Sequence, residues 1–81
     1  MENRLTVVNI IISDREAAVK VNEVLHNYSQ YVIGRMGLPY GQRDVSIICL
    51  VLDMPSDEAS ALSGKLGMIP SVTAKSMTPK L

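Results

Sequence analysis

Few side chains in this sequence have the types and spacing that catalysis or metal binding requires. His26 is the single histidine and Cys49 the single cysteine, and Cys49 stands in an apolar run far from His26. Structural zinc sites use four nitrogen or sulfur ligands, and catalytic zinc sites use about three protein ligands. A nucleophilic cysteine needs exposure and an activating neighbour, which isoleucine and leucine do not supply. We therefore predict no metal site and no cofactor within one chain, with His26 at a helix end and Cys49 in core packing.

The segment Ser63-Gly64-Lys65-Leu66-Gly67 shares only a few letters with a phosphate-binding loop. Ala59 stands where the leading glycine of that motif belongs, and Leu66 replaces the Ser or Thr that would contact magnesium. The apolar spacing also places the segment at the end of a helix rather than between a strand and a helix. We interpret it as a helix terminus carrying a solvated lysine, Lys65.

The segment Gly34-Arg35-Met36-Gly37 is the one that core packing explains least. Glycine lets a backbone come close to a ligand, and the guanidinium of Arg35 offers a rigid fork to an anion or a carboxylate. The alternative is a bulge in an edge strand, with a surface arginine that discourages pairing with other chains. Both interpretations stay open, and Gly34, Arg35 and Gly37 are candidate ligand contacts.

The carboxylates do not form a catalytic pair. Asp14 and Glu16, and likewise Asp57 and Glu58, fall where helices begin and suit the helix dipole. An acylphosphatase-like reaction would need a phosphate-cradling loop after the first strand. The segment Ile11–Arg15 has no glycine there and carries an acidic residue. We therefore predict that the protein is not an enzyme.

Two stretches, Leu5–Ile12 and Val45–Asp53, are apolar at successive positions and rich in β-branched residues, which predicts strands that are covered on both faces. Helical spacing of apolar residues predicts a helix over about 14–28, with a capping box formed by Ser13 and Glu16. A second helix is predicted over Asp57–Leu66, capped by Ser56 or Asp57 and stopped by Gly67.

The remaining segments complete one domain, residues 1–81. Ser29–Tyr40 predicts an irregular strand that forms a hairpin with Val45–Asp53, and Ser71–Met77 predicts a last strand. The order is β-α-β-β-α-β. It predicts an α+β, ferredoxin-like sandwich, in which two helices cover one face of a four-stranded antiparallel sheet.

The second face of this sheet has no element to cover it. The two central strands place apolar side chains on both faces, and such a large exposed patch is unusual in a monomer. We therefore predict a homo-oligomer, a dimer or tetramer, that buries this face or a sheet edge. The competing possibility is a partner protein that covers the same face.

The composition argues against nucleic acids and membranes as partners. Eight basic and eight acidic residues give a net charge of zero, which argues against binding nucleic acid through charge. The sequence predicts no transmembrane segment and no signal peptide. One cysteine in an apolar strand suits a reducing cytoplasm, so we expect a cytoplasmic protein without membrane contact.

Three segments together resemble a known family: Leu25–Ser29, Gly34–Tyr40 and Ala61–Gly67. These segments, in this order along the chain, are similar to those of the iron-only hydrogenase system regulators. The resemblance implies an ACT-like, ferredoxin-like fold, related to the ligand-sensing C-terminal domain of nickel-responsive repressors. It also implies a link to hydrogenase-maturation proteins.

The resemblance implies a place for an amino-acid ligand but no metal site. ACT domains bind amino acids near the loop after the first strand, here Asn9–Asp14, so Asn9 and Asp14 join the candidate contacts by fold analogy. The His/Cys cluster of the nickel-responsive repressors has no counterpart beyond His26 and Cys49. Only Met1–Arg4 precedes the first predicted strand, so we expect no DNA-binding ribbon-helix-helix segment.

Two functions follow from these residues. The first is a ligand-sensing regulatory homo-oligomer, whose small-molecule or anionic ligand contacts Arg35, the neighbouring glycines, and His26 or Lys65. The second is an interaction module or assembly factor that docks a maturation partner through its sheet face. A specific ligand that is lost in Arg35→Ala would favour the first function.

Overall fold

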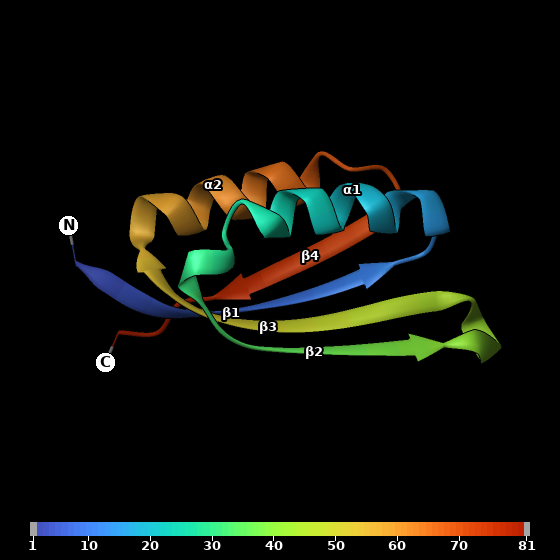
Figure 1. Ribbon diagram of the computed structural model, residues 1–81, viewed down its shortest axis with the longest axis horizontal. Helices are drawn as coiled ribbons and strands as arrows, with labels where there is room; N and C mark the ends of the chain where they lie inside the picture. Colours follow the sequence, from blue (N-terminus) through green and yellow to red (C-terminus); the bar gives the residue numbers. More distant parts are fainter. Residues whose placement is uncertain (1, 81) are drawn as a thin grey trace.

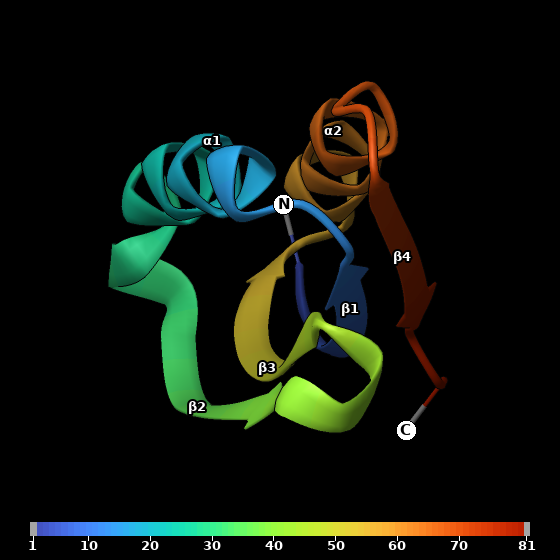
Figure 2. The same ribbon diagram turned by 90° about the vertical axis from the view of Figure 1, so that its right-hand side faces the viewer.

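Two helices cover one face of a four-stranded antiparallel sheet in the computed structural model, which describes residues 2–80 (Figure 1). The elements are β1 (Asn3–Ile12), α1 (Arg15–His26), β2 (Val32–Tyr40), β3 (Val45–Pro55), α2 (Ser56–Gly67) and β4 (Val72–Met77), with short 3-10 turns η1 (Ser29–Tyr31) and η2 (Gly41–Arg43). The strand order is β2-β3-β1-β4, so the two most apolar strands are central neighbours. This arrangement confirms the predicted βαββαβ ferredoxin-like fold, and Figure 2 shows both helices on the same side of the sheet.

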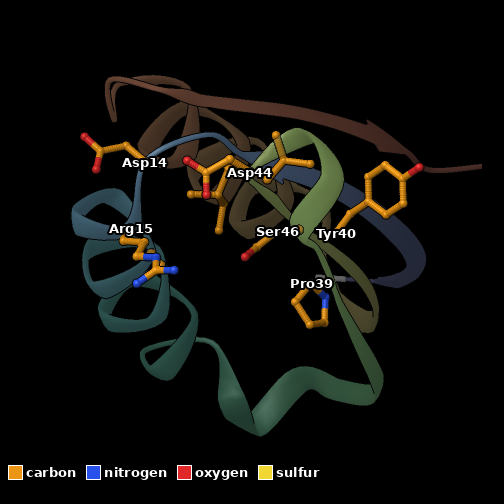
Figure 3. Close-up of a pocket in the computed structure, with 10 residues that line it drawn as sticks. Asp14, Arg15, Pro39, Tyr40, Asp44 and Ser46 are labelled. Carbon is orange, nitrogen blue, oxygen red and sulfur yellow. The ribbon is translucent and has the colours of Figure 1, made fainter.

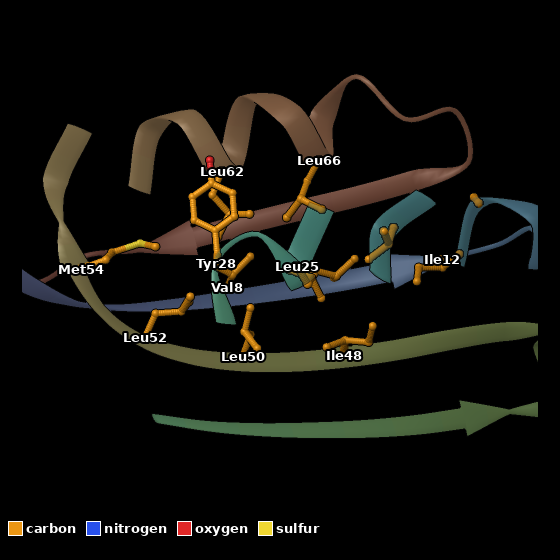
Figure 4. Packing of buried hydrophobic residues seen from close by; sticks show 13 residues of the cluster. Val8, Ile12, Leu25, Tyr28, Ile48, Leu50, Leu52, Met54, Leu62 and Leu66 are labelled. Atoms are coloured by element: carbon orange, nitrogen blue, oxygen red, sulfur yellow. The ribbon is translucent and has the colours of Figure 1, made fainter. Parts of the chain in front are cut away.

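The core lies between the helices and one face of β1 and β3 (Figure 4). Successive side chains of a strand point to opposite faces, so alternate residues of each central strand reach the helices. The buried strand residues are Val8, Ile10, Ile12, Ile48, Leu50, Leu52 and Met54, and the helices add Ala17, Val21, Leu25, Leu62 and Leu66. Val24 and Ala59 are half-buried and pack against this core.

Helix α1 begins with a different cap from the predicted one. The side chain of Asp14 accepts a hydrogen bond from the backbone N–H of Glu16 at 3.0 Å and acts as N-cap. The predicted cap, Ser13, instead uses its backbone N–H and its hydroxyl to donate to the carbonyl of Ser71, at 2.9 and 3.2 Å. The prediction was wrong because Ser13 ties the end of β1 to the segment before β4. The helix ends at His26, and Tyr28 packs into the core from the following turn.

Helix α2 follows β3 without a loop. Pro55 is its N-cap and supplies no side-chain hydrogen bond, so the predicted capping by Ser56 or Asp57 is wrong. Its fixed φ of −58° ends the strand and lets the helix begin at Ser56. At the other end Gly67 lies within the helix, and Met68 is the C-cap in a right-handed conformation. Gly67 therefore does not stop the helix through a left-handed turn as predicted.

Strand β2 is irregular, as predicted. Its register against β3 shifts between Val32 and Gly34, which marks a bulge at this edge of the sheet. The hairpin to β3 closes through η2 and Asp44, whose φ of 53° lies in the left-handed region that Asn and Asp tolerate best among side-chain-bearing residues.

The face of the sheet opposite the helices carries no covering element among residues 2–80. It presents apolar side chains from all four strands: Leu5, Val7, Ile11, Met36, Leu38, Ile47, Val51 and Met77. Several are largely exposed, with Ile11 at 47% and Met77 at 61%. Cys49 lies on this face and is only half-buried, which corrects its predicted place in the core. No helix of the described residues is long and apolar enough to cross a membrane.

Candidate functional site

A cavity of about 210 Å³ lies where β1 turns into α1 (Figure 3). Asp14 and Arg15 line it from the start of the helix, while Tyr40, Asp44 and Ser46 line it from the β2–β3 hairpin. The sheet register brings these segments together, because Ile12 at the end of β1 pairs with Ser46 at the start of β3. Residues about thirty positions apart in the sequence therefore share one small site.

The cavity carries both signs of charge. Figure 3 shows Arg15, Asp44 and Ser46 directed toward the space between α1 and the hairpin, with Asp14 at its rim. The guanidinium of Arg15 can bind a carboxylate or phosphate, and the carboxylate of Asp44 can accept hydrogen bonds from an ammonium group. Ala18 adds an apolar patch to the wall. The site suits a small polar molecule that carries both charges.

A second, more open groove of about 440 Å³ lies between α1 and β2. Leu25, Val32 and Leu50 contribute apolar walls, and the polar lining comes from Asn22, His26, Ser29 and Arg35. The Nη2 atom of Arg35 donates to the Oδ1 atom of Asn22 at 2.6 Å, so one hydrogen bond joins β2 to α1. The guanidinium retains further N–H groups with which it could bind an anion.

The structure brings together two of the predicted contact residues and separates the others. Arg35 and His26 line the same groove. Gly37 pairs with Ile48, and Arg35 pairs with Leu50, so both belong to the helix-side face of β2.

The remaining predicted residues lie elsewhere. Gly34 and Asn9 belong to the open face of the sheet, since they pair with Val51 and with Cys49. Asp14 lines the cavity at the start of α1. Lys65 lies between the helices, where its Nζ atom donates to the hydroxyl of Tyr28 at 3.1 Å.

Sequence reasoning did not single out Arg15, Asp44 or Ser46 as site residues. The sequence predicts no more than a helix start for Arg15 and a strand position for Ser46. The expected pairing of the two apolar strands could have predicted this site. In an antiparallel pair the end of one strand lies beside the start of the other, which places 14–15 next to 44–46.

Within residues 2–80, no three His, Cys, Asp or Glu side chains gather where they could hold a metal ion. His26 lies on α1 and Cys49 on the helix-free face, so the sheet separates them. They cannot form a shared metal site within one chain.

Comparison with solved structures identifies the class of fold. The ACT domain from GTP pyrophosphokinase of Chlorobium tepidum superimposes with a TM-score of 0.78 at 14% identity, covering 93% of this chain and 99% of that one. The C-terminal domain of the MgtC protein from Mycobacterium tuberculosis gives 0.75 at 16% identity, covering 95% and 88%. The chain therefore has an ACT-like fold.

Sequence similarity then places the chain in a family. The model of the TM1266-like family, described as an iron-only hydrogenase system regulator, matches residues 4–76. The uncharacterized protein TM1266 from Thermotoga maritima is 39% identical, with a TM-score of 0.93 and coverage of 98% of this chain and 100% of that one. The chain belongs to this regulator family. No match is found among curated proteins.

Proposed function

We propose that this protein is a non-enzymatic regulatory homo-oligomer of the iron-only hydrogenase system, which senses a small polar or anionic molecule. Binding would shift the equilibrium between association states, because a ligand favours whichever state it binds more tightly. Membership of the regulator family supports the role, and the ACT-like fold supports the sensing mode. The single cysteine is a free thiol, which suits the cytoplasm.

The observation that carries the sensing proposal is the cavity at the start of α1. It is lined by an arginine, two aspartates and a serine hydroxyl, and it lies at the β1–α1 loop that the family resemblance indicates. A ligand there would join α1 to the β2–β3 hairpin. The groove beside Arg35 and His26 is the second candidate for the same role, suited to an anion.

The open sheet face supports the homo-oligomer. Its exposed apolar side chains extend over all four strands, and a patch of this kind marks an interaction surface. A second subunit on this face would remove the apolar surface from water.

The test is a thermal-stability screen of wild type, Arg15→Ala and Arg35→Ala against amino acids, nucleotides, inorganic phosphate and Ni²⁺. A ligand at one hundred times its Kd raises the free energy of unfolding by about 2.7 kcal/mol. We expect at least one amino acid or anion to raise the Tm of wild type. Loss of that shift in Arg15→Ala assigns the cavity, and loss in Arg35→Ala assigns the groove.

A matched control is Arg43→Ala. Arg43 is exposed in η2 and lies outside both linings, so this variant should keep the full ligand-induced shift. A screen in which no compound stabilises wild type would contradict ligand sensing.

The second candidate function is an interaction module that docks a hydrogenase-maturation protein. The exposed side chains of edge strand β2, Ile33, Met36 and Leu38, favour it, because an apolar edge is a template for strand pairing. Capture of a purified maturation protein by wild type, together with a screen that finds no ligand, would favour this function.

A further inference from the structure

The open face of the sheet is built as three complete rows of side chains. Each row takes one residue from β4, β1, β3 and β2 in turn. The rows are Met77-Val7-Val51-Gly34, then Lys75-Asn9-Cys49-Met36, then Thr73-Ile11-Ile47-Leu38. The centre of the face therefore lies in the middle row, between Asn9 and Cys49.

We propose that a second copy of this chain covers the open face, related by a two-fold axis that runs parallel to the strands between β1 and β3. Each row then packs on the same row of the second copy, with β1 over β3 and β4 over β2. Two sheets that pack face to face keep their strands within about 30° of each other, which this axis allows. The inference rests on the proposed homo-oligomer and specifies its interface.

The sizes of the side chains at the two edges support this axis. It places the exposed Met77 of one copy over Gly34 of the other, so that a long side chain meets a residue without one. At the other end of the face, Thr73 meets Leu38. At the edges of both outer rows a larger residue therefore faces a smaller one, which lets the two faces come into close contact.

Gly34 lies beside the bulge of β2 and has room for a side chain within its own chain. A Cβ added there would meet nothing within 4 Å, and its φ is not positive. The chain itself therefore leaves this position open to any residue. A second copy that inserts Met77 would explain why the side chain is missing.

The polar residues of the middle row point to the same axis. The alternative is a two-fold axis that runs along the middle row, perpendicular to the strands. It would place Lys75 of one copy over Lys75 of the other, and two like charges that meet in an interface repel. The axis parallel to the strands sets Lys75 over Met36, where its aliphatic stem packs and the ammonium group stays in water. The carboxamide of Asn9 then lies against the middle row of the second copy. There it can exchange hydrogen bonds with Asn9 of that copy.

The area of the face agrees with a stable dimer. The four strands average nine residues. Strands about 4.8 Å apart that rise about 3.3 Å per residue then give a face of about 600 Å². Two copies would bury about 1,200 Å², the lower end of stable specific interfaces. The face carries one lysine, Lys75, and one aspartate, Asp53, so a second copy meets no net repulsion.

Cross-linking between chosen pairs tests the axis. In a Cys49→Ala background, Lys75→Cys and Met36→Cys lie three strand spacings apart within one chain, about 14 Å, too far for a disulfide. A mixture of the two single variants oxidised with oxidised glutathione should give covalent dimers, whereas each alone should give at least tenfold fewer. Equal cross-linking of each variant with itself would overturn this axis.

Two glycine variants test the face independently. Gly34→Leu should weaken self-association at least tenfold in sedimentation, because the new side chain occupies the place of Met77. Gly37→Leu is the matched control, since it adds the same side chain to the helix-side face of β2. Both variants should keep the circular dichroism spectrum of wild type.

The outcomes separate the two proposals. A wild-type dimer that Gly34→Leu leaves intact, and that gives no cross-link from the mixture, would overturn the sheet-face interface while the homo-oligomer stands. A monomeric wild type at micromolar concentration would overturn both.

Discussion

Asp14 combines two roles at the residue scale. Its carboxylate caps α1 by accepting the N–H of Glu16, and the same residue lies at the rim of the candidate ligand cavity. Ser13, one position earlier, instead joins β1 to the carbonyl of Ser71. The start of α1 is therefore held by the cap at Asp14 and by the contact of Ser13 with Ser71. Both contacts keep Arg15 beside the hairpin.

We expect Asp14→Ala to lower the free energy of unfolding by about 1 kcal/mol, the usual cost of losing an N-cap. Ser13→Ala removes one exposed hydroxyl contact and should cost about 0.5 kcal/mol or less, while its backbone hydrogen bond remains. Urea denaturation of both variants measures the difference. A larger loss in Ser13→Ala would favour the capping box that the sequence predicted.

Tyr28 joins the two helices through its ring and its hydroxyl. The residue is 2% exposed, its ring lies 6.5 Å from that of Tyr31, and the Nζ atom of Lys65 lies 5.2 Å from its ring centroid. Lys65 is exposed, so water competes for its ammonium group. The packed ring should therefore contribute more stability than the hydroxyl.

We expect Tyr28→Phe to cost about 1 kcal/mol or less, since it removes one hydrogen bond to an exposed lysine. Tyr28→Ala should cost about 3–5 kcal/mol, because it leaves a cavity in the core. Chemical denaturation of the two variants gives both values. Equal losses would show that the hydroxyl, rather than the ring, carries the contribution.

At the scale of the element, β3 faces two different environments. Leu50 is 1% exposed and packs against the helices, whereas Ile47 is half-buried on the open face. The strand is apolar on both faces, but only one face is covered within the chain.

The two faces of β3 should respond differently to truncation. We expect Leu50→Ala to lower the free energy of unfolding by about 2–5 kcal/mol through the cavity it leaves. Ile47→Ala should cost about 1 kcal/mol at low micromolar protein concentration, where the open face meets water. The measurement is denaturation at a fixed low concentration, and similar losses would contradict an uncovered face.

At the scale of the whole molecule, stability and association are linked. If the native chain self-associates through the open face, mass action makes its Tm depend on protein concentration. A charge placed on this face would be buried in the associated state and solvated in the monomer, so it should affect association alone.

We expect the Tm of wild type to rise with protein concentration and that of Ile11→Lys to stay constant. Ile11 is 47% exposed, so the lysine should leave the low-concentration Tm nearly unchanged. Scanning calorimetry over a hundredfold concentration range gives the result. Lys20→Ile, a substitution on the exposed part of α1, is a control that should keep the wild-type concentration dependence.

Much of the fold was predictable because local patterns specify it. The two runs that are apolar on both faces predicted the central strands. The helical spacing of apolar residues predicted both helices, and the glycines predicted the bulge in β2. The caps were not predictable from local patterns. Several residues before α1 can accept the same N–H, and α2 begins directly after Pro55, whose side chain accepts none. Asp14 is the N-cap because Ser13 is held by Ser71, a residue 58 positions away in the sequence.

The sequence by itself determined the element order, the central strands and an apolar second face, since these depend on residue types within one segment. Only the tertiary structure decided which face holds Cys49, and that Arg15 lies beside Asp44 and Ser46. Alternation divides a strand into two faces but does not say which one the helices cover. That depends on how the helices cross the sheet, as the site depends on how β1 pairs with β3.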